Sequence, residues 1–300
     1  MDMFFVLSGY IVNVIAKKND GPAVFFWHRL ARIVPLYWIF TISLFLFSIK
    51  YSSYLDSGES DYTGLIKSLL FIPYQKGESN ITPILGVGWT LNFEMLFYVA
   101  VAISLKFTRQ IGYKFVVVVL ISLFYWLVSD GCGVYSDFYK YEYLMEFLVG
   151  LYVVPFLINI SSEVVCSTKI KWAFIFLLCF IMVLFDLIDT ELSRFIAYGV
   201  PAALLCAVFA HFGNEIKDGF ISKIFISVGD SSYSLYITHV FVIEFYRKIV
   251  FKHIFLQEFV SLIPLVVTFI SCIVVSITVH QFLDSPIQKR LRSIALGKLK

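Results

Sequence analysis

Two neighbouring segments near the N-terminus set the pattern of the chain. Residues 3–10 read Met3-Phe4-Phe5-Val6-Leu7-Ser8-Gly9-Tyr10, and residues 25–38 read Phe25-Phe26-Trp27-His28-Arg29-Leu30-Ala31-Arg32-Ile33-Val34-Pro35-Leu36-Tyr37-Trp38. The first segment is as apolar as the beginning of a membrane helix, and the second places two arginines at the start of the next apolar run. Long apolar runs separated by polar loops continue to the C-terminus, so this pair predicts the architecture of the whole chain.

Composition assigns the chain to the polytopic membrane proteins. Of its 300 residues, 59% are hydrophobic and 15% are charged, whereas soluble domains carry about 25% charged residues. The mean hydropathy is +0.84, and a spanning helix needs about 20 apolar residues. The apolar runs predict an all-α membrane bundle of about nine transmembrane helices in a single domain (1–300), at about 3–16, 31–49, 84–105, 113–128, 143–160, 172–188, 195–212, 232–250 and 260–283.

The distribution of basic residues predicts the orientation of this bundle. Two thirds of the 24 lysines and arginines lie in the loops 17–34, 106–114, 161–171 and 213–231 and in the tail 284–300. The positive-inside rule places this set, and with it the basic C-terminal tail, in the cytoplasm. The alternate loops then lie outside. The largest, 50–83, contains a short apolar segment, 65–74, which we expect at the membrane interface.

The polar residues exclude several other kinds of site. The five cysteines show no CxxC spacing, so neither a metal site nor a disulfide framework is indicated. The basic residues form no tract of the kind that binds nucleic acid. We therefore expect no bound metal, no bound cofactor and no nucleic-acid partner, and membrane lipids as the surroundings.

Arg29 and Arg32 are the first candidates for a binding site. Three residues apart on a helix, they share a face at the cytoplasmic end of the second predicted span. Guanidinium groups bind phosphate through paired hydrogen bonds, so the pair predicts a site for a phosphorylated donor such as a coenzyme A thioester. The alternative is that both arginines only anchor the helix and fix its orientation.

Glu94 and His239 are the candidates for chemistry within the membrane. Glu94 lies near the middle of its predicted span, where a carboxylate is costly and usually functional. It predicts a general base, a group that binds a sugar hydroxyl, or the orienter of a histidine; the alternative is a structural hydrogen bond. His239 shares a helical stripe with Ser232, Tyr236 and Tyr246 that must face protein or water. It predicts a proton carrier, and the alternative is a packed histidine.

The remaining ionisable residues favour structural roles. We expect His280 and Asp284 to cluster with His211 at the cytoplasmic face, where Pro286 ends the last helix. Glu146 is expected near an outer interface. The basic residues of the tail are expected to fix orientation and contact anionic lipid: Lys289, Arg290 and Arg292.

Five short motifs follow one another along the chain: Asp2 with Phe4-Phe5-Val6-Leu7-Ser8-Gly9-Tyr10, Arg29-x-x-Arg32-Ile33-x-Pro35-Leu36-Tyr37-Trp38, Trp89-Thr90-Leu91-x-x-Glu94, Ser232-Tyr233-Ser234-Leu235-Tyr236-x-x-His239 and Asp284-x-Pro286. In this order they resemble the membrane acyltransferase 3 family, which usually has glutamate in place of Asp284. The resemblance implies a ten-helix enzyme of a bacterial inner membrane. Such enzymes transfer an acyl group, commonly acetyl, from cytoplasmic acyl-CoA to a hydroxyl of a surface glycan, such as O-antigen or exopolysaccharide, or of its lipid-linked precursor.

The resemblance also implies roles for particular residues. Arg29 and Arg32 would handle the acyl donor, and Glu94 and His239 would be catalytic. Four further positions would belong to the family motifs on the acceptor side: Trp89, Tyr233, Ser234 and Tyr236. The family's best-attested catalytic histidine lies on a first helix upstream of the segment matching Asp2, and the 300 residues do not include that helix. This accounts for nine helices instead of ten, and it predicts little or no activity from these 300 residues alone.

Two other classes of function fit the same residues. A transporter or flippase for a lipid-linked sugar would also use a buried Glu94 and a polar stripe, but the paired broken helices of such proteins are not evident in the sequence. A non-catalytic partner in surface-glycan assembly is the other alternative. Transfer of labelled acetyl groups to glycan distinguishes the enzyme from both.

Overall fold

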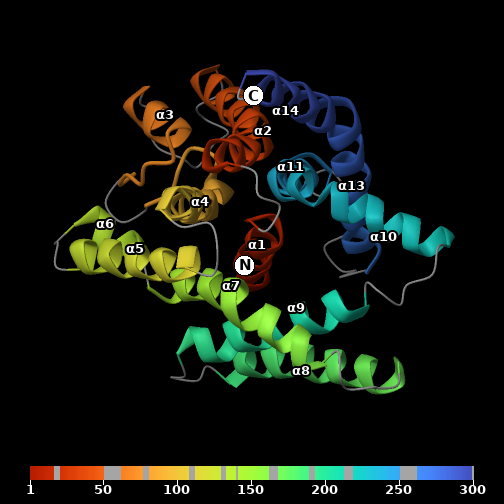
Figure 1. Ribbon diagram of the computed structural model, residues 1–300. Coiled ribbons are helices and arrows are strands. Elements are labelled where there is room, and N and C mark those ends of the chain that lie inside the picture. Colours follow the sequence, from red (N-terminus) through yellow and green to blue (C-terminus); the bar gives the residue numbers. More distant parts are fainter. Residues whose placement is uncertain are drawn as a thin grey trace. The chain divides into compact units, whose positions relative to one another are not determined.

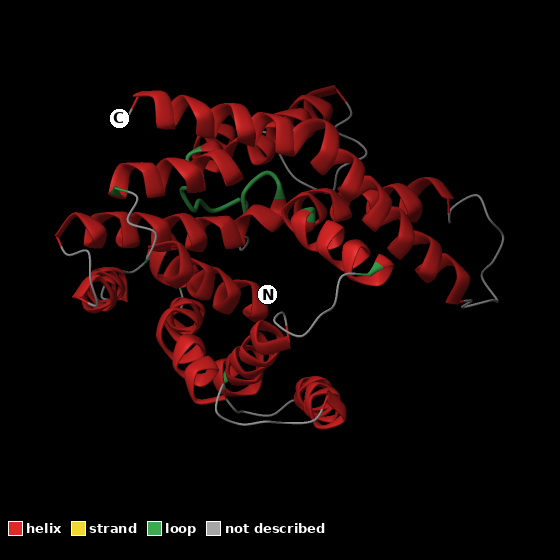
Figure 2. Cartoon of the chain, turned by 45° about the vertical axis from the view of Figure 1, so that its right-hand side comes forward, coloured by secondary structure: helices red, strands yellow, loops and turns green. Residues whose placement is uncertain are grey.

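The computed structural model describes residues 1–16, 21–50, 62–76, 81–107, 112–129, 133–139, 141–161, 168–188, 193–212, 219–250 and 262–298. In this part of the chain every regular element is helical (Figures 1 and 2). The chain divides into two compact units, which we describe separately. The first unit combines Met1–Phe26 with Asn92–Ile216, and the second unit combines Trp27–Leu91 with Lys217–Lys300.

The predicted fold class is confirmed, because a helix occupies each of the nine predicted ranges. Among the described residues, six helices are long and apolar enough to cross a membrane, within Pro22–Ile49, Gly86–Phe107, Gly112–Ser129, Glu142–Ile160, Lys169–Ile188 and Pro264–Ile294. Two shorter apolar helices are Asp2–Ala16 and Phe195–His211. These helices identify an integral membrane protein. The count of nine spans and the sidedness of the loops stay predictions.

The first unit contains the helices α1 (Asp2–Ala16), α5 (Gly112–Ser129), α6 (Val134–Phe138), α7 (Tyr141–Ser161), α8 (Thr168–Ile188), η3 (Phe195–Gly199) and α9 (Val200–Phe212), with most of α4 (Trp89–Phe107). Helices α1 and α7 pack through two glycines. A Cβ atom on Gly9 would overlap the backbone oxygen of Phe147, and a Cβ atom on Gly150 would overlap that of Val6. Small residues let membrane helices approach closely, so these two positions determine the α1–α7 contact.

Aromatic side chains fill the space between α1, α4 and α7. The ring of Phe5 lies 4.8 Å from the ring of Phe147 and 6.0 Å from that of Phe93, measured between centroids. Phe97 stacks on Phe147 at 4.7 Å. These four rings are fully buried, and tilted or offset aromatic pairs are more favourable than their buried area alone suggests. The core of the first unit is therefore apolar and closely packed.

The second unit contains the helices α2 (Pro22–Lys50, from Trp27 on), α3 (Tyr62–Leu69), η2 (Gly86–Gly88), α10 (Phe220–Asp230), α11 (Ser232–Phe245), η4 (Tyr246–Val250), α13 (Leu262–Val279), η5 (His280–Asp284) and α14 (Ser285–Lys298). Helix α3 packs against α2. The Tyr37 hydroxyl donates to the backbone oxygen of Ser68 (3.2 Å), and Trp38 Nε1 donates to that of Leu69 (2.9 Å). Part of the predicted apolar segment 65–74 is thus a helix held by hydrogen bonds from α2.

The C-terminal helices follow one another without a break. The π-helical turn η5 joins α13 to α14, and the residues on either side of it, Val279 and Ser285, keep helical dihedral angles. Figure 1 shows this path in blue. Pro286 is the second residue of α14, a position where proline's missing N–H and fixed φ are tolerated. The prediction that Pro286 ends the last helix is therefore wrong, and the predicted tail is helical as far as Lys298.

Candidate functional site

A cavity of about 260 Å³ lies in the second unit, between side chains of α2, α10, α11, η5 and α14. We call it the anion pocket. Its lining includes Arg32, Tyr233, His280, Asp284, Lys289 and Arg292. The structure therefore brings together the predicted donor residue Arg32, the Tyr233 motif and the C-terminal residues, which lie far apart in the sequence.

Three basic side chains, Arg32, Lys289 and Arg292, line this pocket together with two carboxylates, Asp230 and Asp284. Arg292 lies close enough to Arg29 and Arg32 for the three guanidinium charges to repel one another, although Arg29 is only 7% exposed. Among the described residues, neither Arg32 nor Arg292 forms an ion pair with a carboxylate. Guanidinium groups on several helices can bind phosphate oxygens through charge-assisted hydrogen bonds, so the pocket suits a phosphorylated ligand.

Asp284 is the centre of the polar network beside the pocket. It is 3% exposed, and it accepts hydrogen bonds from Ser234 Oγ (3.2 Å) and Gln288 Nε2 (2.7 Å). His280 Nδ1 lies 3.0 Å from Asp284 Oδ2, and Arg292 Nη2 donates to Gln288 Oε1 (3.1 Å). We call His280, Asp284, Gln288 and Arg292 the Asp284 stripe. Sequence reasoning paired His280 with Asp284 but missed the other two residues, although all four recur at every fourth position.

Two hydrogen bonds fix α2 against the helices around the pocket. The Tyr233 hydroxyl donates to the backbone oxygen of Ile33 (2.6 Å), next to Arg32. Trp27 Nε1 donates to the backbone oxygen of Leu291 (2.8 Å), next to Arg292. The two arginines are therefore presented by helices that are joined to each other and to α11.

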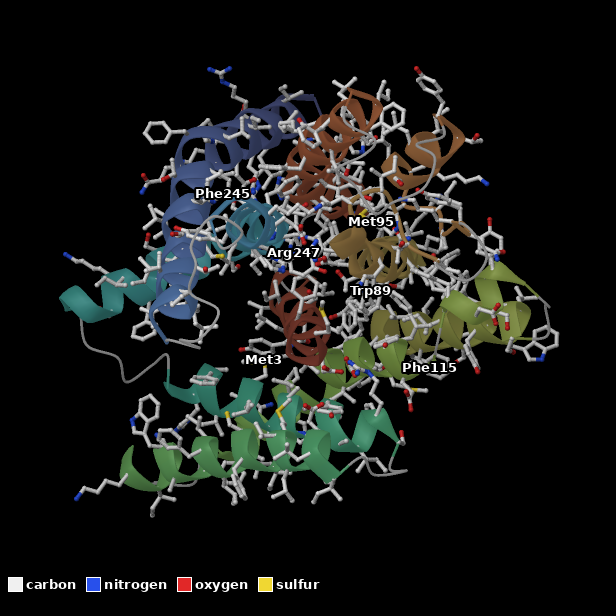
Figure 3. The ribbon with its side chains drawn as sticks, turned by 180° about the vertical axis from the view of Figure 1, so that it is seen from behind. Met3, Trp89, Met95, Phe115, Phe245 and Arg247 are labelled. Carbon is white, nitrogen blue, oxygen red and sulfur yellow. The ribbon has the colours of Figure 1, made fainter. Side chains whose placement is uncertain are left out.

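Tyr236 joins α11 to the start of the tryptophan motif. Its hydroxyl donates to the backbone oxygen of Val87 (2.6 Å) and lies 2.6 Å from Thr90 Oγ1, which donates to the same backbone oxygen (3.2 Å). Trp89, labelled in Figure 3, is the first residue of α4 and precedes Thr90. Two predicted motifs thus meet here through Tyr236.

The imidazole of His239 has a defined orientation. Its Nδ1 lies 2.9 Å from the backbone oxygen of Tyr236 and 3.2 Å from that of Leu235. Carbonyl oxygens only accept, so the hydrogen sits on Nδ1, and Nε2 of the neutral ring carries a lone pair. His239 follows Tyr233 by six residues, which corresponds to about 9 Å along a helix. The contacts of Nδ1 therefore leave Nε2 as the ring nitrogen without a hydrogen.

The buried face of α11 differs from the expected stripe. Tyr233, Ser234, Ile237 and Thr238 are its buried residues, whereas Ser232 is exposed and His239 is partly buried. That the stripe of Ser232 and His239 faces protein or water stays a prediction, and α11 packs through the face centred on Tyr233 and Ile237.

Glu94 lies in the first unit and has two hydroxyl partners. Its Oε1 accepts hydrogen bonds from Ser8 Oγ (3.1 Å) and from the hydroxyl of Tyr98. The residue is 4% exposed, as expected for a carboxylate within a membrane helix. Glu94 thereby links α4 to α1. Since His239 belongs to the second unit, the orientation of a histidine by Glu94 stays a prediction.

A second buried carboxylate in the first unit was not expected. Glu146 is fully buried and lies beside Asp2 and Arg194. Arg194 Nη2 donates to Asp2 Oδ1, which joins α1 to the residues preceding η3. Glu146 is thus enclosed by protein, and its place near an outer membrane interface stays a prediction. Its position near a helix end gave no sign that α1 and η3 would cover it.

The described residues contain no group of three or more His, Cys, Asp or Glu side chains that could hold a metal ion.

Comparisons with known proteins identify the family to which the chain belongs. A model described as an acyltransferase domain matches residues 1–280. The exopolysaccharide production protein ExoZ of Rhizobium meliloti (strain 1021) is 34% identical over 163 residues, which are 52% of this chain and 50% of ExoZ. ORF330 of Acidianus two-tailed virus is 21% identical over 252 residues, or 81% of this chain and 72% of that protein.

A third relative is the acyltransferase MdmB of Streptomyces mycarofaciens, which is 29% identical over 118 residues, or 37% of this chain and 29% of MdmB. The chain thus matches about half the length of ExoZ and less of MdmB. No solved structure matches the chain.

Proposed function

The chain belongs to the acyltransferase domain family, and we propose that it is a membrane O-acyltransferase. In this proposal it transfers an acyl group, commonly acetyl, from cytoplasmic acyl-CoA to a hydroxyl of a cell-surface polysaccharide or of its lipid-linked precursor. The observation that carries the proposal is the anion pocket, which Arg32 and Arg292 line without either forming a salt bridge to a carboxylate among the described residues.

The donor would bind through its phosphates. Coenzyme A carries several phosphate oxygens, and guanidinium groups recognise them through paired, charge-assisted hydrogen bonds. Arg29 and Arg32 supply such groups from α2. The positive-inside rule places this end of α2 in the cytoplasm, which is where acyl-CoA is found. The predicted donor role of both arginines is therefore part of the proposal.

His239 would act as the general base. Its Nε2 takes the proton of the acceptor hydroxyl while the hydroxyl oxygen forms a bond to the thioester carbonyl carbon. The carbon–sulfur bond then breaks, and the coenzyme A thiolate leaves and takes the proton from the imidazolium. The bonds from Nδ1 to backbone oxygens on α11 favour this assignment, because they leave Nε2 as the basic nitrogen.

The acceptor class is supported by one relative. ExoZ is named for exopolysaccharide production, and a polysaccharide offers the hydroxyl that this chemistry needs. Trp89, Tyr233, Ser234 and Tyr236 remain the candidates on the acceptor side. Of these, Tyr236 has a hydroxyl close to both a backbone oxygen and Thr90.

Labelled acetyl-CoA tests the proposal directly. Membranes from cells that express the gene at its own locus, and from a deletion strain, receive acetyl-CoA labelled in the acetyl group. The expected result is label in polysaccharide, as a base-labile ester, only when the gene is present. Movement of unmodified glycan that depends on the gene would instead indicate a transporter.

The same assay with two arginine variants separates donor binding from a general charge effect. Arg32→Ala is expected to raise the KM for acetyl-CoA, while Arg247→Ala is expected to leave it unchanged. Arg247 lies on η4, is labelled in Figure 3, and pairs at the surface with Glu244. Glycan acetylation that is insensitive to Arg32→Ala would point to a non-catalytic partner of another enzyme.

A further inference from the structure

The Asp284 stripe lines the anion pocket from the C-terminal helices η5 and α14, whereas Arg32 lines it from α2. We propose that Arg292 is a third residue that binds the donor's phosphates, and that Asp284 and Gln288 are positioning residues that hold its guanidinium. This inference rests on the proposed function, since it adds a residue to the same donor site. It also makes α14 part of the binding machinery instead of a basic anchor on the lipid.

The position of Arg292 is fixed by a chain of hydrogen bonds. Asp284 is held by Ser234 Oγ on α11, and it accepts a bond from Gln288 Nε2. This bond orients the amide of Gln288 so that its Oε1 accepts from Arg292 Nη2. Each member sits one helical turn after the previous one on η5 and α14. The guanidinium is therefore held from one side, and its other donors remain for a ligand.

The docking of α14 places Arg292 beside the arginines of α2. Trp27 Nε1 donates to the backbone oxygen of Leu291, the residue before Arg292. The charges of Arg29 and Arg32 then act on Arg292, and the charge of Asp284 opposes them. Like charges this close are unfavourable unless anions lie near them, and a bound phosphate group would add to the negative charge that Asp284 supplies.

Arg292 also has a donor that no side chain uses. Its Nε is buried and has no hydrogen-bond partner in the part of the chain that the structure describes. Nη2 already serves Gln288, and a guanidinium carries five N–H groups. A buried donor without an acceptor is destabilising, so this atom indicates a ligand with acceptor oxygens. Arg290, two residues earlier, is exposed and does not line the cavity.

Binding of coenzyme A to the purified full chain tests the inference without requiring acyl transfer. The chain is placed in nanodiscs of phosphatidylcholine, and Kd is measured by calorimetry. Arg292→Ala is expected to raise Kd by about 10-fold or more, and Arg292→Lys by less, because lysine keeps the charge. Arg290→Ala removes the same charge from the same helix and is expected to change Kd less than twofold.

The positioning role predicts a specific pattern of coupling. Gln288→Ala is expected to raise Kd by a few-fold in the wild-type background and to have no further effect in Arg292→Ala, because contacting residues are non-additive. A merely structural residue would weaken binding in both backgrounds. Elution as one folded species in size-exclusion chromatography confirms that each variant can be compared.

Different outcomes separate the possible failures. If the wild-type chain binds coenzyme A and Arg292→Ala binds it equally well, the inference is wrong and the proposed function stands. If the wild-type chain does not bind coenzyme A, both are wrong. A second set of nanodiscs containing phosphatidylglycerol tests the lipid headgroup as an alternative phosphate source. An Arg292→Ala effect confined to these discs would assign Arg292 to lipid and overturn the inference.

Discussion

The two units solve the problem of polar groups in a membrane in opposite ways. In the first unit two carboxylates are buried: Glu94 accepts from two hydroxyl groups, and Glu146 lies beside Asp2 and Arg194. In the second unit guanidinium groups lie around a cavity, and Asp284, one of the two carboxylates that line it, has its oxygens occupied by hydrogen bonds. Burial of a charge is costly unless it is paired. The first unit therefore carries the features of a scaffold, and the second unit those of a binding site.

The sharpest test of the second unit is the removal of its basic nitrogen. His239→Gln, introduced into the gene at its own locus, is expected to lower kcat for acyl transfer by about 10²- to 10⁴-fold, the usual contribution of a general base. Binding of coenzyme A is expected to be unchanged, because His239 does not line the anion pocket. Kinetics at saturating donor measure the change in kcat, and calorimetry on the same preparation measures the affinity for coenzyme A. A variant with wild-type kcat would assign His239 to packing.

The corresponding test of the first unit adds a single methyl group at a glycine in the contact between α1 and α7. Gly150→Ala is expected to cost about 3 kcal/mol of unfolding free energy, since the new Cβ overlaps the backbone oxygen of Val6. Thermal or denaturant unfolding in detergent measures it. Gly86→Ala is the control, because a Cβ there meets nothing within 4 Å. Equal stability of the two variants would mean that α1 and α7 do not need their close approach.

Glu94 tests whether the first unit is only a scaffold. Glu94→Ala is expected to cost about 2 kcal/mol, because Ser8 and Tyr98 lose their shared acceptor. Glu94→Gln keeps an acceptor oxygen of the same reach, so it is expected to restore most of this stability. Parallel measurements of unfolding and acyl transfer decide the role. A stable Gln variant that has lost activity would make Glu94 catalytic and break the contrast between the units.

The smallest expected effect concerns the contact between α11 and the tryptophan motif. Tyr236→Phe removes the hydroxyl that bonds to Val87 and Thr90, at a cost of about 1 kcal/mol. Tyr246→Phe is a matched control at the start of η4, where the hydroxyl lies 2.9 Å from Ser271 Oγ. If acyl transfer falls further in Tyr236→Phe than stability accounts for, the hydroxyl also contacts the acceptor.

The sequence was sufficient for features that depend on local pattern. Apolar runs located the helices, and the motif of Arg29 and Arg32 contains one residue that lines the anion pocket, Arg32. Contacts between segments that are distant in the sequence could not be predicted from local pattern. Nothing in the surroundings of Gly9 indicates that it meets Phe147, and Glu146 resembled an interfacial residue because its partners, Asp2 and Arg194, come from other parts of the chain.

The Asp284 stripe shows a different reason for failure. Its four residues follow a regular spacing, so the pattern was present in the sequence. Pro286 was interpreted as the end of a helix, and the residues after it were treated as a tail. Proline is also favoured at the first positions of a helix, and the π-helical turn η5 carries the chain into α14 without a break. Pro286 thus marks the beginning of α14 and not the end of the preceding helix.

The crowding of Arg29, Arg32 and Arg292 has a practical consequence for handling the protein. Any polyanion that binds among them stabilises the folded chain by mass action, by about 2.7 kcal/mol at a concentration of 100 times its Kd. Pyrophosphate or sulfate in a buffer would then raise the melting temperature and, at the same time, compete with the donor. Purification in phosphate would favour the yield of folded protein and mask its affinity for coenzyme A, so the two should be measured in different buffers.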